Sequence, residues 1–297
     1  MPVVAALAAG AWLTSPSAVS LASHVDARLR RSNATAVPLT AVAPIMREAV
    51  VATEDERFYR HHGVDVIGVL RTLPYDLVHL TFAQGASTIT EQVAKLLYLH
   101  GNDHTPWRKL EDAAVAFKLE DRYDKERILD AYLNSVYFGE GAYGVKAASE
   151  HYFGVLPRSL GAADASLLAG LIQAPSAYDP SLHPRSARER QLDVLRSLVR
   201  DGLMTNDAAA AAVGRSLRLR SAITLPPVRG IDFRPGPAFV WWELTLGLAI
   251  GVCGAGVLVA SRVPRFRVVH GLVAIRALAA VLALVGAATV VRSFRAA

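Results

Sequence analysis

The sequence predicts a mostly α-helical protein, with a helical domain followed by two transmembrane helices. Between residues 41 and 213, apolar residues recur at helical spacing and short Pro- or Gly-containing breaks divide the stretch into successive helices. Two later stretches, 238–260 and 271–291, each contain a single charged residue, Glu243 and Arg276. Each is long enough to cross the ~30 Å of hydrocarbon in a bilayer. The sequence therefore predicts a helical domain that is held at a membrane.

The chain divides into six expected segments. A basic loop with three arginines joins the two predicted transmembrane helices, and short basic loops stay on the cytoplasmic side of a plasma membrane. The helical domain is therefore expected on the outer face. The segments are an N-terminal membrane anchor and basic stretch (1–35), the helical domain (36–213), a Pro-rich linker (214–237), a transmembrane helix (238–260), the cytoplasmic loop (261–270) and a second transmembrane helix (271–291).

The N-terminal segment is read as an anchor, although its signals conflict. Residues 2–25 are apolar, but Ser15-Pro16-Ser17 interrupts them and the basic residues follow the apolar stretch instead of preceding it. A cleaved signal peptide would begin with a positively charged region, so an anchor is favoured. A misplaced start codon that removed a basic leader would explain the same pattern, and this alternative stays open.

Composition excludes some classes of partner. The net charge is +6, yet aromatic and basic residues do not alternate as they do in nucleic-acid modules. No nucleic acid is expected, and anionic lipid or a pyrophosphate is the better partner for the positive charge. The single cysteine, Cys253, falls inside a predicted transmembrane helix and can form no intramolecular disulfide.

The first helix of the domain is expected to begin at Pro44 and to end near Glu54. A carboxylate at a helix C-terminus is disfavoured by the macrodipole, which would raise its pKa toward the range of a general base. Partial burial would raise the pKa in the same direction. The acidic pair Glu54-Asp55 lies close to Phe58 and two histidines, and this combination suggests a catalytic site.

The second helix is expected over residues 89–99, because Thr88 and Glu91 form a capping box. Gln92 and Lys95 are three residues apart and share a face, while the free N–H groups of the first turn offer an anion site beside Ser87. A simpler interpretation remains open, in which Ser87 and Thr88 only cap the helix and Lys95 is solvated.

The remaining helices follow the same spacing. Helices are expected from Trp107 to about Tyr123, over 125–137, within 160–171 as a buried Ala- and Leu-rich element, and over 188–198. The glycine-rich run 138–144 lacks the preceding strand of a dinucleotide site, so it is interpreted as a turn.

Five elements, in order along the chain, carry a family resemblance. Residues 54–63 fit E-D-x-x-F-x-x-H-x-G, and residues 85–95 fit G-x-S-T-I-T-x-Q-x-x-K. Arg108-Lys109 then begins an R-K-x-x-E element, residues 125–134 match K-x-x-I-L-E-x-Y-L-N with Asp130 for Glu, and Arg190 with Val194-Leu195 echoes a last element. Over about residues 43–198 the chain resembles the peptidoglycan glycosyltransferase (transglycosylase) domain, glycosyltransferase family 51, of monofunctional transglycosylases and class A penicillin-binding proteins.

The resemblance implies a lysozyme-like helical fold and a reaction. The family polymerises lipid II into glycan strands with inversion and releases undecaprenyl pyrophosphate. Carried over residue by residue, Glu54 would be the general base and Asp112 would stand for a second catalytic acid. The residues assigned to substrate binding are Asp55, Ser87, Thr88, Gln92, Lys95, Arg108 and Lys109.

The implied partners are lipid II, the growing glycan chain and membrane lipid, at the plasma membrane of a bacterium. Cell-wall synthesis or division proteins are further partners that the sequence leaves open. No protein metal site is predicted, and a divalent cation, Mg²⁺ or Mn²⁺, at the pyrophosphate is left open. No transpeptidase is expected, since S-x-x-K, K-T-G and K-S-G motifs do not occur in these 297 residues.

Departures from the family pattern keep alternatives open. Asp112 replaces a glutamate, Glu91 replaces a glutamine and Leu96 replaces an asparagine. The first alternative is a degenerate, non-catalytic protein that binds lipid II or a partner. The second is a lysozyme-like peptidoglycan hydrolase in which one glutamate acts as general acid.

Overall fold

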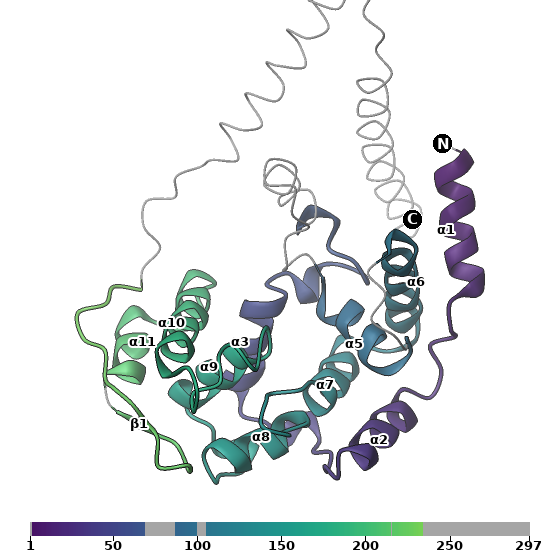
Figure 1. The fold of residues 1–297 in the computed structure, drawn as a ribbon. Helices are drawn as coiled ribbons and strands as arrows, with labels where there is room; N and C mark the ends of the chain where they lie inside the picture. Colours follow the sequence, from purple (N-terminus) through teal and green to yellow (C-terminus); the bar gives the residue numbers. More distant parts are fainter. Residues whose placement is uncertain (1, 69–86, 100–104, 215, 234–297) are drawn as a thin grey trace, which may run out of the picture. The chain divides into compact units, whose positions relative to one another are not determined.

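The computed structural model describes residues 2–68, 87–99, 105–214 and 216–233 (Figure 1). The chain separates into two units, one formed by Met1–Ala6, Val66–Phe82 and Ala238–Ala297, and one by Leu7–Asp65 and Ala83–Pro237. The expected transmembrane helices over 238–260 and 271–291, and the loop 261–270 between them, lie outside the described residues. Within the described ranges, no helix is both long and apolar enough to cross a membrane.

The N-terminal segment forms two helices where one apolar anchor is expected. Helix α1 (Pro2–Thr14) has 13 residues, and a span needs about 20. Helix α2 (Leu21–Arg31) begins after Ser20, which has a left-handed backbone conformation. Its Leu21, Val25 and Leu29 are buried in the main core of the domain. Helix α2 therefore packs against the helical domain.

Helix α3 (Pro44–Glu54) lies at the centre of one half of the core. It begins at a proline in its first turn and ends at Glu54, as the sequence predicts. It packs against α9 (Ala162–Leu171) and α10 (Pro184–Arg200), which also pack against each other. All residues from Ala165 to Leu171 are buried, so the Ala- and Leu-rich run is the interior helix that its composition predicts.

The other half of the core is built around α5 (Ile89–Leu97), which packs against α6 (Pro106–Arg122) and α7 (Lys125–Ser135). The capping box of α5 is present, because Thr88 Oγ1 accepts from Glu91 N and Glu91 Oε2 accepts from Thr88 N. The side chains of Thr105 and Asp124 cap the starts of α6 and α7 by accepting from Arg108 N and Arg127 N. Side-chain caps thus fix where these helices begin.

Short elements connect these helices. They are η1 (Leu39–Ala41), η2 (Phe58–Arg60), α8 (Gly144–Tyr152), η3 (Pro157–Ser159), α11 (Asn206–Val213), β1 (Leu217–Arg218) and β2 (Thr224–Leu225). The glycine-rich run 138–144 is a turn, as predicted. At its end Gly144 has φ +80°, and a Cβ there would lie 2.7 Å from Asn134 O. A side chain at this position would separate α7 from α8.

The segment expected to be a linker, 214–237, is docked on the domain over residues 216–233. β1 and β2 pair antiparallel, with Leu217 opposite Leu225. Leu225 is fully buried and Phe233 is 2% exposed. Arg188 donates to Pro226 O, and Phe233 N donates to Asn206 Oδ1 at 2.6 Å. Residues 216–233 therefore pack against the helical domain.

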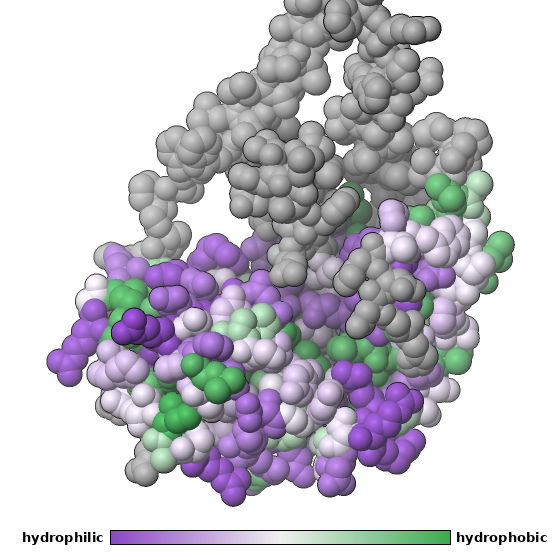
Figure 2. Space-filling view, in the orientation of Figure 1, coloured by the Kyte–Doolittle hydropathy of each residue, from purple (hydrophilic) through white to green (hydrophobic). Residues whose placement is uncertain are grey.

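The coloured surface of the domain in Figure 2 is mostly hydrophilic or neutral, with separate apolar spots. This distribution agrees with a core that gathers the large apolar side chains, among them Phe58, Phe138 and Tyr132. The core therefore fixes the ends of α3, α5 and α6, and the candidate site lies at these ends.

Candidate active site

Glu54 is the last residue of α3, and its side chain is half-buried. Gln92 Nε2 donates a hydrogen bond to Glu54 Oε2 at 2.9 Å. Burial raises the pKa of Glu54, the neighbouring Asp55 raises it further, and the Gln92 hydrogen bond and the charge of Arg190 oppose the shift. The position at a helix end is the one predicted, but desolvation is the leading cause of the raised pKa.

A buried tyrosine completes a chain of hydrogen bonds to this carboxylate. Tyr132 on α7 is fully buried, and its hydroxyl donates to Gln92 Oε1 at 2.7 Å. Burial, together with the negative charges of Glu54 and Asp55, raises the pKa of Tyr132 well above its usual value, so the hydroxyl stays a donor. The sequence assigned no site role to Tyr132. Its position inside the 125–134 pattern was the only signal for it.

Asp55 ties the loop after α3 to the start of α5. Both of its oxygens lie 2.9 Å from His61 Nε2, and Oδ2 also accepts from Ile89 N at 3.0 Å. The residue is only 7% exposed. The Asp55 carboxylate therefore links the loop after α3, next to Glu54, to the first turn of α5, which carries Gln92.

Thr88 and Ser87 have different roles at the start of α5. Thr88 is 2% exposed, and its hydroxyl donates to Gly63 O at 2.6 Å while it accepts from Glu91 N. Thr88 therefore caps α5 and links it to Gly63. Ser87 Oγ instead accepts from Lys109 Nζ at 3.0 Å, so Ser87 belongs with the cations of the site.

Asp112 organises two of the predicted cations. Its Oδ2 lies 3.4 Å from Lys95 Nζ on α5, and its Oδ1 lies 3.4 Å from Arg108 Nε on its own helix α6. Asp112 is 2% exposed, whereas the Lys95 side chain is 44% exposed. The shorter acid thus reaches both partners and leaves the ammonium group of Lys95 open to solvent.

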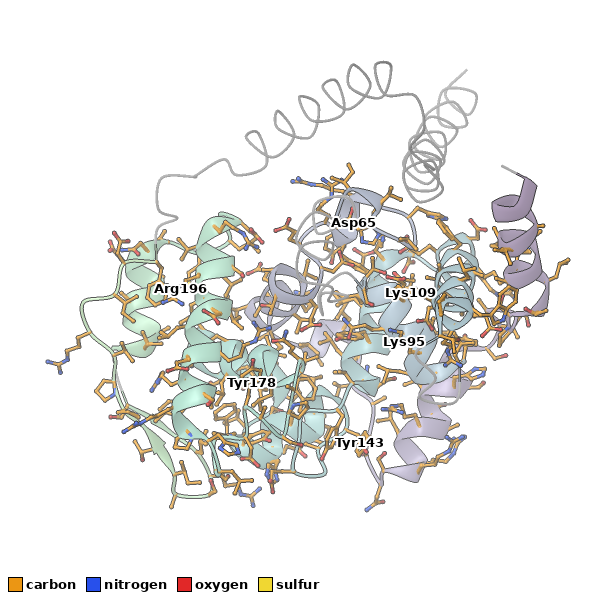
Figure 3. The ribbon with its side chains drawn as sticks, turned by 45° about the horizontal axis from the view of Figure 1, so that its top comes forward. Asp65, Lys95, Lys109, Tyr143, Tyr178 and Arg196 are labelled. Atoms are coloured by element: carbon orange, nitrogen blue, oxygen red, sulfur yellow. The ribbon has the colours of Figure 1, made fainter. Side chains whose placement is uncertain are left out.

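Lys109 lies beside this group, and Figure 3 shows Lys95 and Lys109 on the neighbouring helices α5 and α6. Lys109 Nζ lies 2.8 Å from Oε1 of Glu91, whose side chain is 1% exposed. We call Lys95, Arg108, Lys109 and Ser87 the cation cluster. Among the described residues its three cations face two carboxylates, Asp112 and Glu91, so the cluster is a candidate site for an anionic ligand.

Helix α5 connects the two ends of the site. Gln92 contacts Glu54, and Lys95, one turn later, contacts Asp112. All nine sequence-predicted site residues are described, and they divide into the Glu54 end, the Asp55 and Thr88 supports, and the cation cluster with Asp112. Across the described ranges, no group of three or more His, Cys, Asp and Glu side chains is placed to hold a metal ion.

Two further residues contribute charge at the site. Arg190 on α10 acts on Glu54 electrostatically, and its guanidinium lies 5.9 Å from the centre of the Tyr178 ring. Glu91, noted in the sequence as a cap and as a departure from the family, also pairs with Lys109. The sequence pattern around residue 190 indicated Arg190. No sequence signal indicated the ion pair between Glu91 and Lys109, because it joins two different helices.

Comparison with known proteins supports one family. The family model described as Transglycosylase matches residues 21–199. The chain is 42% identical over 173 residues to penicillin-binding protein 1A of Neisseria lactamica, covering 58% of this chain and 22% of that protein. It is 38% identical over 193 residues to penicillin-binding protein 1F of Bacillus subtilis, covering 65% of this chain and 27% of that protein. The chain thus spans about a quarter of the length of these curated relatives.

A solved structure, penicillin-binding protein 1A from Haemophilus influenzae, matches 34% of this chain and 15% of its own chain. The sequence identity is 31% and the TM-score is 0.32. The matched part is too small to compare the two folds.

Proposed function

The chain belongs to the transglycosylase family, and on this premise we propose that it is a peptidoglycan glycosyltransferase that polymerises lipid II into glycan strands. The observation that carries the proposal is the arrangement along α5. A half-buried carboxylate with a raised pKa, Glu54, stands at one end, and the cation cluster stands at the other. A base and an anion site are the two parts that this reaction needs.

In the proposed reaction, Glu54 takes the proton from the 4-hydroxyl of the acceptor GlcNAc. The oxygen attacks C1 of the donor MurNAc with inversion, the bond from C1 to the pyrophosphate oxygen breaks, and undecaprenyl pyrophosphate leaves. Negative charge develops on the leaving group, and the cation cluster stabilises it. Burial favours this role for Glu54, since a base works best when its pKa lies near the operating pH.

Asp112 is proposed to position cations and to take no proton. It is paired with Lys95 and Arg108, and its side chain is almost fully covered. Replacement of the family's glutamate by the shorter aspartate therefore leaves the cluster assembled. A divalent cation, Mg²⁺ or Mn²⁺, bound with the pyrophosphate is a further proposal.

We also propose a location and further partners. The apolar stretches 238–260 and 271–291 and the basic loop between them favour a membrane protein with its catalytic domain on the outer face. Membrane lipid would then be a neighbour, and cell-wall synthesis or division proteins would be partners. The transpeptidase reaction is not part of the proposal.

Two other functions make different predictions. A hydrolase would also use a carboxylate of raised pKa, but it would have no use for three cations at the far end of α5. A non-catalytic protein would bind lipid II without turnover, and the departure at Asp112 is the observation that favours it.

Purified full-length protein with labelled lipid II separates these functions. Polymer that disappears in Glu54→Gln, but persists in Glu56→Gln, supports the proposal. Glu56 is a suitable control because it is an acidic residue two positions after Glu54 that pairs with Arg200 at 3.0 Å. Shortening of finished glycan would instead indicate a hydrolase, and binding of lipid II without turnover would indicate the degenerate protein.

A further inference from the structure

Gln92 is held between two oxygen-bearing side chains from different helices. Its Nε2 donates to Glu54 Oε2 at 2.9 Å, and its Oε1 accepts from the Tyr132 hydroxyl at 2.7 Å. The three residues come from α3, α5 and α7. An amide bound on both sides has one orientation in which every group is satisfied.

The tyrosine selects this orientation. A carboxylate can only accept hydrogen bonds, and an amide that turned its oxygen toward Glu54 would place two acceptors together. The Tyr132 hydroxyl can donate, so it captures Oε1 and leaves Nε2 directed at Glu54. Tyr132 is fully buried, so water does not replace its hydroxyl as a donor from that side.

Other charged groups adjoin Glu54 or lie on the helices packed against α3. They are not part of the hydrogen-bond chain from Tyr132 through Gln92 to Glu54. Asp55 adjoins it, and Arg190 faces it from α10. On α9, the other helix packed against α3, Asp164 bonds to Gly161 N. Arg200 of α10 pairs with Glu56. None of these contacts passes through Gln92, so a change at Tyr132 reaches Glu54 through the amide.

We propose that Tyr132 is a positioning residue that acts through Gln92 to keep Glu54 in its charged, proton-accepting form. The inference rests on the proposed function, because it needs Glu54 to be the base. A donated hydrogen bond stabilises the carboxylate over the carboxylic acid. When the hydroxyl is removed, the amide is free to turn, the bond to Glu54 is lost, and Glu54 holds its proton to a higher pH.

The expected signature is a shift along the pH axis. A base must be deprotonated to act, so kcat/KM falls as pH drops through the pKa of Glu54 in the free enzyme. In Tyr132→Phe this acid limb should move upward by about 0.5 to 1 pH unit, the scale of one lost hydrogen bond to a charged group. At pH values below the pKa of Glu54, kcat/KM of Tyr132→Phe should be about 3- to 10-fold lower than that of the wild type. At higher pH the difference should disappear. A merely structural defect would lower the rate equally at every pH.

Matched variants keep the test specific. Tyr152→Phe is the control, because Tyr152 is also buried and its hydroxyl bonds to Phe138 O at 3.0 Å, away from the site. Its acid limb should stay in place. Gln92→Leu removes the amide and should shift the limb as Tyr132→Phe does. The double variant should shift it no further, because the two changes interrupt one chain.

A second measurement does not depend on activity. Titration of the Glu54 side-chain carboxyl by carbon-13 NMR, with Glu54→Gln to assign the signal, should show the same upward shift in Tyr132→Phe and none in Tyr152→Phe. This titration still tests the inference if Gln92→Leu folds poorly, because it compares Tyr132→Phe with Tyr152→Phe. An unchanged limb and an unchanged titration in Tyr132→Phe would overturn the inference, and so would a shift in the double variant equal to the sum of the two single shifts.

The inference and the proposed function fail in different ways. If Glu54→Gln still polymerises lipid II, the proposed function is wrong. If Glu54→Gln is inactive and Tyr132→Phe keeps the wild-type pH profile, only the role of Tyr132 is wrong.

Discussion

The ammonium group of Lys109 lies 2.8 Å from Oε1 of Glu91. Glu91 is also the third residue of α5 and the acidic member of its capping box, so one carboxylate both caps a helix and pairs with a cation of the proposed anion site. A glutamine here would keep the cap, because its side chain also accepts from the backbone N–H of Thr88, but it would not neutralise Lys109.

Glu91→Gln should therefore bind the pyrophosphate of the donor more tightly. The cluster gains one positive charge, and because Lys109 is half exposed the gain is small, about two- to fivefold in KM for lipid II. Steady-state kinetics at low ionic strength measure it, and the difference should shrink as salt is added. A KM that is unchanged or higher would show that Glu91 does not limit the charge of Lys109.

Asp112→Asn should lower kcat/KM by about 10- to 100-fold, since Lys95 and Arg108 would lose the carboxylate that holds them together. Asp112→Glu, which restores the family's residue, should retain activity at or above that of the wild type. The comparison is made in the lipid II polymerisation assay. If the asparagine variant keeps full activity, the positioning role given to Asp112 is wrong.

Asp55→Ala should destabilise the domain. The Ile89 N–H and His61 would lose a buried partner, at a cost of about 1 to 3 kcal/mol for the unsatisfied donor. Thermal unfolding followed by circular dichroism measures the loss. Asp207→Ala, at an exposed position on α11, is the control and should change stability by less than about 0.5 kcal/mol. Equal effects of the two variants would argue against the linking role of Asp55.

Glu54→Gln should be more stable than the wild type at neutral pH. The folded-state pKa of Glu54 is raised by burial, so its contribution to stability is present below the unfolded pKa and is lost as pH rises through the folded pKa. The neutral glutamine mimics the protonated form at every pH. The difference in Tm should therefore be largest at neutral pH and disappear in acid, and a difference independent of pH would contradict the raised pKa.

Local signals in the sequence predicted much of the fold. The proline at residue 44, the capping box at Thr88 and the Ala- and Leu-rich run of α9 each determine structure within a few residues, so they could be recognised without coordinates. The packing of α2 could not be, because Leu21, Val25 and Leu29 continue an apolar stretch that looks like an anchor. Residues 216–233 have no regular periodicity, and only their contacts with α8, α10 and α11, among others, show that they are docked.

In the candidate site, too, some features could be predicted from local sequence patterns and others could not. Residue types in motifs indicated Glu54, Gln92, Lys95, Arg108, Lys109 and Asp112, and the structure gathers them along α5 and its neighbours. The pairing of Tyr132 with Gln92 joins residues 40 positions apart, and the pairing of Lys109 with Glu91 joins two helices. Such contacts depend on how the helices pack, which no local pattern specifies.

The rate at which glycan polymer forms from labelled lipid II, compared between the wild type and Glu54→Gln, tests the central claim most directly. The wild type should form polymer, and Glu54→Gln should lose at least about 100-fold of the rate while it still binds lipid II, since only the general base is removed. Polymerisation by Glu54→Gln at close to the wild-type rate would show that Glu54 is not the base.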